Sequence, residues 1–186
     1  MAKENVSPVW SRTFPMTISH GEGCYVFDTE GRRYLDFTSG IGVTNTGHCH
    51  PKVVAAAQAQ VAKIIHAQVN NYYHLPLLEL TDPLLTIVPD KSFDTFFFTN
   101  SGAEALEGAI KLARHATKKP NIITFQGAFH GRTNMTMATD TGSTIYRAGY
   151  APLASGVYIA PYPYAYRYGW DPETTSQWCL SELRHM

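Results

Sequence analysis

A run of three phenylalanines at residues 96–98 leads into a polar, glycine-containing stretch at residues 99–103. The aromatic run predicts a buried strand. Behind the polar stretch, apolar residues recur every three or four positions, which predicts an amphipathic helix. These apolar residues are Leu106, Ala109, Ile110 and Ala113. The pattern therefore predicts a strand that runs directly into the N-terminus of a helix.

Two further apolar runs, residues 121–125 and 156–160, predict short strands. Strands that alternate with a helix are typical of a parallel α/β sheet. Ligands of such sheets bind beyond the carboxyl ends of the strands. The stretches after the first two strands, residues 99–103 and 126–133, are therefore the candidate binding loops. An amphipathic pattern at residues 178–186 predicts a last helix.

The N-terminal part of the chain predicts an irregular start followed by a hairpin. Residues 7–20 contain two prolines and are expected to be irregular. Strand-like runs at residues 24–27 and 33–37 are joined by the turn-rich residues 28–31, which predicts a β-hairpin. A loop with three glycines follows at residues 38–47. Its small residues suit a backbone that is held close to another group.

Two helices are predicted between this loop and the phenylalanine run. Pro51 suits the first position of a helix, and apolar residues at helical spacing extend to about Gln68. A second helix is predicted over residues 76–87. Pro83 should bend or shorten it, because proline has no backbone N–H to donate.

Composition and charge narrow the classes of function. The 186 residues are 44% hydrophobic, which is enough for a core, and 15 basic side chains balance 15 acidic ones. The balance predicts no general attraction to nucleic acid or to a membrane surface. Neither a signal peptide nor a membrane-spanning run is recognised, so a cytoplasmic location is expected. An odd number of widely spaced cysteines predicts reduced thiols; they are Cys24, Cys49 and Cys179.

The start of the predicted helix at residue 102 has the chemistry of an anion site. The first N–H groups of a helix lack intrahelical partners and carry partial positive charge. Gly102 would allow a phosphate to approach the backbone, and Ser101 could add a hydroxyl donor. The alternative is a capping box between Ser101 and Glu104, which stabilises a helix without any ligand. Both interpretations stay open at this point.

The loop at residues 126–133 brings three further functional groups to the neighbouring strand end. Phe129 offers an aromatic plate, His130 an imidazole and Arg132 a guanidinium group. Together with the predicted anion site they fit an aromatic, phosphorylated cofactor and an acidic substrate. The alternative places Phe129 in the core and leaves Arg132 as a solvated charge.

A second set of residues raises the question of a metal. Histidine and cysteine at residues 48–50 are types that bind zinc, but a structural zinc site needs four ligands. No second cluster of matching spacing occurs in the sequence, so no metal site is predicted.

Four ordered motifs make residues 8–186 resemble the class III aminotransferases, the omega-type branch of the fold-type I enzymes that use pyridoxal 5'-phosphate. The motifs are residues 28–37, 47–51, 99–105 and 127–133. Residues 107–114 and 146–150 add a similarity to 4-aminobutyrate aminotransferases. The resemblance implies an α/β fold that is incomplete here. Residues 1–71 would form the N-terminal segment, and residues 72–186 the first part of the cofactor-binding large domain with its parallel sheet.

The resemblance also assigns roles to individual positions. Ser101, Gly102 and Ala103 would hold the cofactor phosphate, Phe129 would stack on the pyridine ring, and His130 would lie beside it. The first assignment agrees with the anion chemistry of a helix N-terminus.

Two positions would contact the substrate. Arg132 matches the arginine that binds the carboxylate far from the reacting amine, and Ile41 matches a substrate-pocket position in the glycine-rich loop. A guanidinium group suits this task because it binds a carboxylate with two parallel hydrogen bonds. An apolar Ile41 fits a short, unbranched substrate such as 4-aminobutyrate.

Members of this family are considerably longer than this chain. Their additional part carries the Schiff-base lysine, the aspartate that pairs with the pyridinium nitrogen, and an arginine for the α-carboxylate. None of the lysines present here matches that position, so the catalytic lysine is expected beyond Met186. The chain is interpreted as the N-terminal portion of an aminotransferase and is expected to be inactive alone.

The predicted activity is transfer of an amino group from an omega-amino acid, similar to 4-aminobutyrate, to 2-oxoglutarate. The partners are a small-molecule amino donor and an oxo-acid acceptor, with a homodimer expected for the full-length form. The alternatives are an acetylornithine, ornithine or related decarboxylating enzyme, and a non-catalytic remnant that associates with a full-length subunit.

Overall fold

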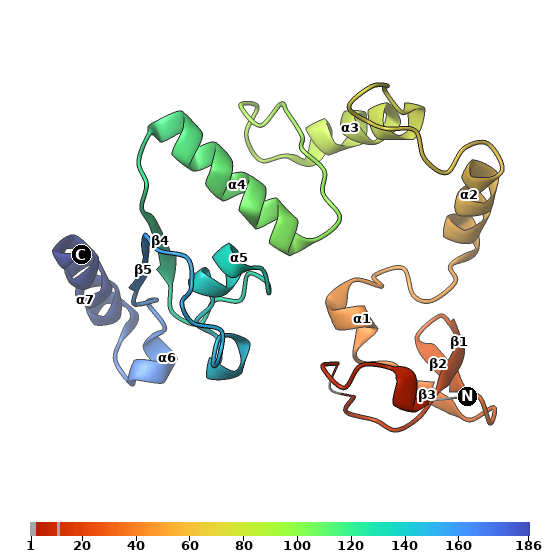
Figure 1. Cartoon of the computed structure of the whole chain (residues 1–186), viewed down its shortest axis with the longest axis horizontal. Helices are drawn as coiled ribbons and strands as arrows, with labels where there is room; N and C mark the ends of the chain where they lie inside the picture. Colours follow the sequence, from red (N-terminus) through yellow and green to blue (C-terminus); the bar gives the residue numbers. More distant parts are fainter. Residues whose placement is uncertain (1–2, 11) are drawn as a thin grey trace. The chain divides into compact units, whose positions relative to one another are not determined.

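The computed structural model describes residues 3–10 and 12–186, and the chain forms two compact units, Met1–Ile87 and Val88–Met186 (Figure 1). The sequence resemblance placed the start of the large domain at residue 72, and this boundary stays a prediction. No helix in the described part of the chain combines the length and apolar character that crossing a membrane requires.

The first unit contains an antiparallel sheet of three strands in the order β1 (Ile18–Glu22), β2 (Tyr25–Asp28) and β3 (Arg33–Leu35). The hairpin of β2 and β3 confirms the sequence prediction. β1 corrects it, because the segment expected to be irregular through residue 20 already pairs with β2 from Ile18 onward. A bulge between Ile18 and His20 interrupts the register, and this irregularity obscures the alternation that would have indicated a strand.

Asp28 organises the hairpin turn from a buried position. Its carboxylate accepts the backbone N–H groups of Glu30 and Arg32, the Nε–H of Arg32 and the hydroxyl of Tyr34, at 2.8 to 3.0 Å. Burial raises the pKa of Asp28, but the hydrogen bonds, those from Arg32 first, outweigh it and lower the pKa to about 2. The turn is therefore held by an ionised carboxylate.

In the described part of the first unit, helical structure comprises a 3-10 turn (Lys3–Asn5) and the helices α1 (Ser39–Gly42), α2 (Pro51–Val61) and α3 (Leu75–Ile87). α2 begins at Pro51 as predicted but ends at Val61, short of the expected Gln68. Ile65 belongs to the apolar spacing that predicted a longer helix, but its side chain is exposed. Apolar spacing does not extend a helix where the apolar side chains find no packing partner. α3 continues through Pro83 to Ile87.

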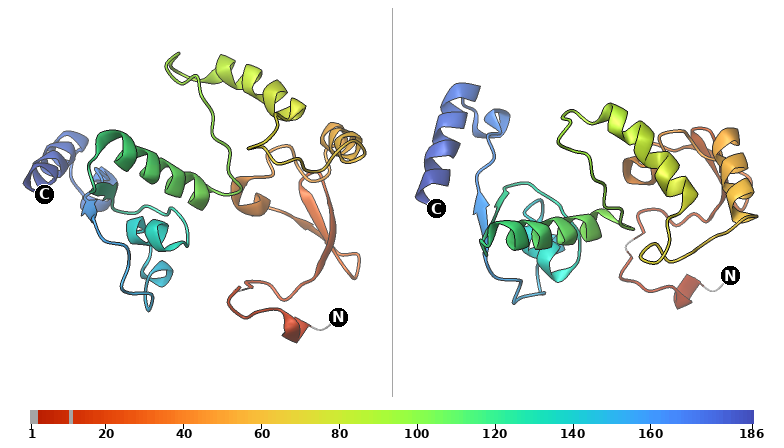
Figure 2. Two further views of the ribbon diagram at one scale, coloured as in Figure 1. Left: turned by 45° about the horizontal axis from the view of Figure 1, so that its top comes forward. Right: turned by 90° about the horizontal axis from the view of Figure 1, so that it is seen from above.

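The second unit is built around a parallel pair of strands, β4 (Ile122–Phe125) and β5 (Val157–Ala160). Ile122 lies opposite Val157, and Phe125 lies opposite Ala160. The long helix α4 (Gly102–Thr117) precedes β4, and α5 (Asn134–Thr139) lies in the crossover to β5 (Figure 2). The predicted parallel α/β arrangement is confirmed.

The remaining elements of this unit are a 3-10 turn (Thr144–Tyr146) and the helices α6 (Ala165–Tyr168) and α7 (Pro172–His185). α7 extends the predicted C-terminal helix toward its N-terminus. It begins after Asp171, whose carboxylate accepts the N–H and hydroxyl of Thr174 and thereby caps the helix.

The predicted strand at residues 96–98 is wrong. These residues have no regular structure, and Phe97 is 83% exposed. A strand needs a neighbour for its backbone hydrogen bonds. Among the described residues, the parallel sheet contains only β4 and β5, which pair with each other. An aromatic run specifies a preference for β structure, but not the partner that would satisfy its backbone.

The core of the second unit mixes apolar side chains with threonines. Ile110, Met135, Ala138, Ala160 and Cys179 are buried. Thr136, Thr139 and Thr175 are buried as well, and each hydroxyl donates a hydrogen bond to a backbone carbonyl. These bonds allow the hydroxyl groups to be buried without loss of hydrogen bonding.

Candidate functional site

The N-terminus of α4 combines a helix cap with free backbone donors. Ser101 is extended, and its Oγ accepts the N–H of Glu104 at 3.2 Å. The Glu104 carboxylate accepts the N–H of Asn100 at 2.7 Å, one residue earlier than in a standard capping box. In the described part of the chain, the N–H groups of Ser101, Gly102 and Ala103 have no acceptor. Capping and anion binding are therefore compatible, because they use different N–H groups.

A cavity of about 750 Å³ lies beside this helix N-terminus. The first turns of α4 form one wall with Gly102 and Ala103, and a loop forms the other wall with Phe129, His130 and Arg132. A Cβ atom placed on Gly102 would meet nothing within 4 Å, so the backbone is open to the cavity at this point. The structure thus brings together five of the residues that the sequence singled out.

Gly131 allows the loop to approach α4 this closely. Its φ is +139°, and a Cβ atom there would lie 2.6 Å from Cβ of Ala103 and 2.9 Å from Oγ1 of Thr136. The hydroxyl of Thr133 also donates a hydrogen bond to the carboxylate of Glu107 on α4. Close packing and this hydrogen bond fix the distance between the two walls.

Phe129 lies at the surface of the cavity and not in the core, contrary to the alternative that the sequence left open for this residue. Its side chain is 51% exposed. The ring packs against Tyr146 with centroids 4.7 Å apart and planes inclined at 58°. Sequence reasoning did not identify this role of Tyr146, because the contact joins segments separated along the chain.

His130 contacts the residues at the C-terminal end of α5. Its backbone N–H donates to Oδ1 of Asp140, and its Nδ1 lies 3.3 Å from the carbonyl oxygen of Thr139. Asp140 is completely buried. Sequence reasoning missed Asp140, since a single aspartate after a short helix carries no recognisable signal.

Arg132 is exposed and lines the cavity, and in the described part of the chain it forms no ion pair with a carboxylate. Its guanidinium group therefore keeps its capacity to bind an acidic ligand.

Ile41 belongs to the first unit, in a turn of left-handed backbone. Ser39, Gly40, Ile41 and Gly42 have φ values of 46°, 58°, 65° and 77°. The conformation is costly for a branched residue such as isoleucine. Ile41 is also 94% exposed, so packing within its own unit does not explain the conformation.

No cluster of metal ligands exists among residues 3–10 and 12–186. Nε2 of His48 forms a hydrogen bond with the carboxylate of Asp36.

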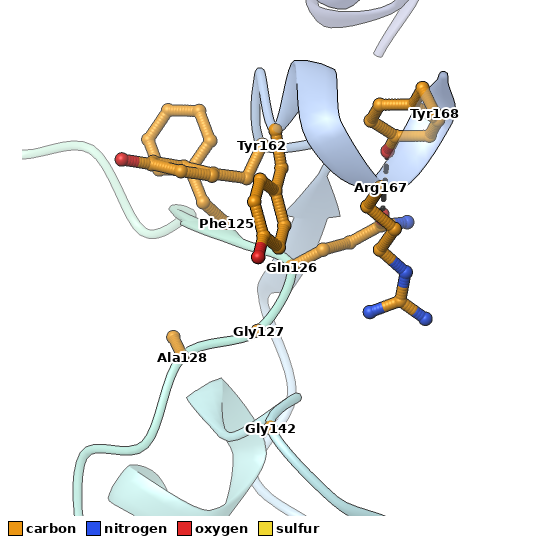
Figure 3. A pocket seen from close by; sticks show the side chains of 9 residues that line it. Phe125, Gln126, Gly127, Ala128, Gly142, Tyr162, Arg167 and Tyr168 are labelled. Carbon is orange, nitrogen blue, oxygen red and sulfur yellow. Dashed lines mark hydrogen bonds between the residues drawn. The ribbon is translucent and has the colours of Figure 1, made fainter.

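A second cavity, of about 530 Å³, lies where β4 and β5 end. Figure 3 shows the rings of Phe125 and Tyr162 on one side and Arg167 and Tyr168 on the other. The Tyr168 hydroxyl donates to Oε1 of Gln126 at 3.3 Å. Three tyrosines that follow β5 thus line this hollow, Tyr162, Tyr164 and Tyr168.

Comparison with known proteins gives a consistent family. The sequence profile of the family described as "Aminotransferase class-III" matches residues 6–186. A probable 4-aminobutyrate aminotransferase of Bacillus subtilis is 44% identical over 147 residues, covering 79% of this chain and 34% of the relative. An acetylornithine aminotransferase of Halalkalibacterium halodurans is 47% identical over 147 residues, covering 79% and 37%.

A solved structure shares the fold. The (S)-enantioselective omega-transaminase from Thermomicrobium roseum superposes with a TM-score of 0.85 at 30% identity, over 97% of this chain and 43% of that one. The chain spans little more than a third of the length of the two curated relatives.

Proposed function

The chain belongs to the class-III aminotransferase family, and from this premise we propose that its protein transfers an amino group from an omega-amino acid similar to 4-aminobutyrate to 2-oxoglutarate, with pyridoxal 5'-phosphate as cofactor. One observation carries the proposal. Free N–H groups at the start of α4 and the exposed face of Phe129 border the same cavity.

The residues present fit this cofactor. A phosphate group needs several donors and positive potential, which Ser101, Gly102 and Ala103 supply through unpaired N–H groups at a helix N-terminus. A pyridine ring needs a flat apolar surface, which Phe129 supplies, with Tyr146 supporting the ring. When bound, the cofactor would supply an electron sink for the reacting carbon atom.

The residues of this chain then bind and orient the cofactor and the substrate. Backbone N–H groups hold the phosphate, Phe129 fixes the plane of the ring, and Arg132 binds the distal carboxylate of the substrate with two hydrogen bonds. Ile41 in the glycine-rich loop would restrict the substrate to a short, unbranched chain. Ala105, Leu106 and Ala109 give the cavity an apolar surface beside the helix N-terminus.

The reacting lysine is not among the cavity residues. No lysine lines the cavity in the described part of the chain. We therefore propose that this chain is the N-terminal part of a longer polypeptide, which supplies the lysine. We also propose that two copies of this longer polypeptide form a homodimer. Aminotransferase chemistry needs such a lysine to move the proton.

Acetylornithine is the second candidate amino donor. The observation in its favour is the 47% identity to an acetylornithine aminotransferase, against 44% to a probable 4-aminobutyrate aminotransferase. Both names concern substrates with a distal amine and a carboxylate, so Arg132 serves either one. A non-catalytic chain that pairs with a full-length subunit is the alternative outside enzymes.

Cofactor binding can be tested without turnover. The purified chain is titrated with pyridoxal 5'-phosphate and, as a matched ligand, with pyridoxal, while tryptophan fluorescence is recorded. We expect the phosphate to strengthen binding about tenfold or more, since charge-assisted hydrogen bonds contribute about 1.5–3 kcal/mol each. Equal affinity for the two ligands would refute the phosphate site.

A further inference from the structure

Asp140 carries a buried carboxylate with an unused oxygen atom. The residue is 0% exposed, and it directly follows α5. Oδ1 accepts the backbone N–H of His130, whereas Oδ2 has no hydrogen-bond partner among the described residues. Burying a carboxylate that is only partly hydrogen-bonded is costly, so the position calls for an explanation beyond packing.

The surroundings of His130 supply the explanation. Nδ1 of its ring lies 3.3 Å from the carbonyl oxygen of Thr139 and 4.0 Å from Oδ1 of Asp140. The carbonyl oxygen of Thr139 can only accept a hydrogen bond, because it carries no hydrogen. Oδ1 of Asp140 already acts as an acceptor, from the backbone N–H of His130. The hydrogen atom of a neutral imidazole at this position is therefore favoured on Nδ1, and Nε2 is left as an acceptor.

The residues that follow Asp140 also hold the backbone of the loop that carries the ring. The N–H groups of Thr141 and Gly142 donate to the carbonyl oxygen of Ala128 at 2.8 and 2.9 Å, and the N–H of Ala128 donates to Oγ1 of Thr141 at 3.0 Å. Arg147 donates to the backbone carbonyl of Asp140 at 2.9 Å. The segment after α5 therefore forms a rigid support for the loop that carries Phe129.

We propose that Asp140 is a positioning residue of the cavity: it fixes the backbone of His130 and keeps the ring hydrogen on Nδ1, so that Nε2 is the nitrogen offered to a ligand in the cavity. This inference rests on the proposed function only in naming pyridoxal 5'-phosphate as that ligand. Asp140 acts through His130 and touches no ligand itself. His130 lines the cavity, which is why its tautomer bears on binding.

The test uses Asp140→Asn, which keeps an oxygen to accept the His130 N–H but removes the charge. Asp171→Asn is the matched control, because that residue caps α7, lines neither cavity, and asparagine caps a helix equally well. The chain and both variants are labelled with ¹⁵N. Long-range proton–nitrogen spectra give the tautomer of each histidine, and His130→Gln assigns the signal of His130.

The expected result has two parts. The unchanged chain and Asp171→Asn should show His130 with hydrogen on Nδ1, and Asp140→Asn should shift its population toward the Nε2–H form. Asp140→Asn should also bind pyridoxal 5'-phosphate about two- to tenfold more weakly, the range expected for one hydrogen-bonding arrangement.

Contrary results are equally defined. An Nε2–H tautomer in the unchanged chain overturns the inference without recourse to any variant, even if Asp140→Asn does not fold. Lower stability of Asp140→Asn with an unchanged nitrogen spectrum overturns it as well, because the role would then be structural only. If the unchanged chain fails to bind the cofactor, the proposed function fails, while the tautomer still decides the role of Asp140.

Discussion

The carboxylate of Asp36 lies 2.8 Å from Nε2 of His48, and this hydrogen bond joins the two ends of the glycine-rich loop that carries Ile41. The same carboxylate accepts the N–H and the hydroxyl of Thr38 at 2.9 and 2.6 Å and the N–H of Ser39 at 3.2 Å. One side chain thus holds a turn whose left-handed backbone would otherwise relax.

This arrangement predicts a specific pH dependence of folding. Hydrogen bonds from Thr38 and then His48 hold the pKa of Asp36 well below its usual range, and the pKa of Asp28 is lowered to about 2. A lowered pKa means that the stabilisation is present above the unfolded value of about 3.9 and is lost as the pH falls through the folded value.

The urea midpoint of the first unit should therefore fall steadily between about pH 4 and pH 2. Circular dichroism measured over this range provides the test. Asp28→Asn should flatten the dependence. Asp94→Asn should not, because Asp94 lies in the second unit and, among the described residues, its carboxylate accepts only the hydroxyl of neighbouring Thr95. An equally steep dependence in Asp28→Asn would show that other groups control acid unfolding.

Gly131→Ala should disrupt the cavity by forcing its two walls apart. The new Cβ would lie 2.6 Å from Cβ of Ala103, and α4 cannot retreat without moving its N-terminus. Gly127→Ala is the matched control, because Gly127 also has a positive φ of 87° but has nothing within 4 Å of the new Cβ.

Both variants should lose about 1–3 kcal/mol to backbone strain, and only Gly131→Ala should lose cofactor affinity in addition. Urea unfolding and titration with pyridoxal 5'-phosphate separate the two effects. Matching cofactor affinities for the two variants would mean that the approach of Gly131 to Ala103 is irrelevant to the cavity.

Gly102→Asp should separate helix stability from anion binding. An aspartate in the first turn of a helix is favourable for the helix itself, by about 0.3–1 kcal/mol. The same charge would repel a phosphate at the free N–H groups of α4. We expect unchanged or slightly higher stability together with loss of pyridoxal 5'-phosphate binding, while Gly102→Ala keeps much of the binding. Normal cofactor affinity in Gly102→Asp would contradict the assignment of the phosphate position.

The sequence predicted those parts of the fold that depend on residues close together along the chain. The cap and helix of α4, the hairpin around Asp28 and the strands β4 and β5 each follow from a local pattern. The predicted strand at residues 96–98 failed because its partner is not local, and β1 was missed because a bulge breaks its alternation.

The candidate site follows the same division. Gly102, Phe129 and Arg132 could be identified because they stand in short motifs beside predicted strand ends. Tyr146 and Asp140 could not, since their roles arise from contacts with residues about ten or more positions away along the chain. A motif specifies the groups that touch a ligand, and tertiary structure specifies the groups that hold them.

Arg132→Ala should reduce the use of substrates with a distal carboxylate. In the longer protein that carries the catalytic lysine, kcat/KM for 4-aminobutyrate should fall about tenfold to a hundredfold, the loss expected for a charge-assisted pair of about 1.5–3 kcal/mol. Turnover of an amine without that carboxylate should change little, and Arg132→Lys should recover only part of the loss. Equal losses with both amines would assign Arg132 a role in folding.

Residues 1–186 alone should not transaminate, although they should bind the cofactor. The free N–H groups of α4 and the ring of Phe129 provide binding, but no lysine lines the cavity in the described part of the chain, so the amine that the reaction needs is missing there. The assay combines the purified chain, 4-aminobutyrate, 2-oxoglutarate and pyridoxal 5'-phosphate, with a preparation of Gly102→Asp as control for contaminating host enzyme. Glutamate formation that scales with the chain and disappears in Gly102→Asp would prove that residues 1–186 contain the required amine.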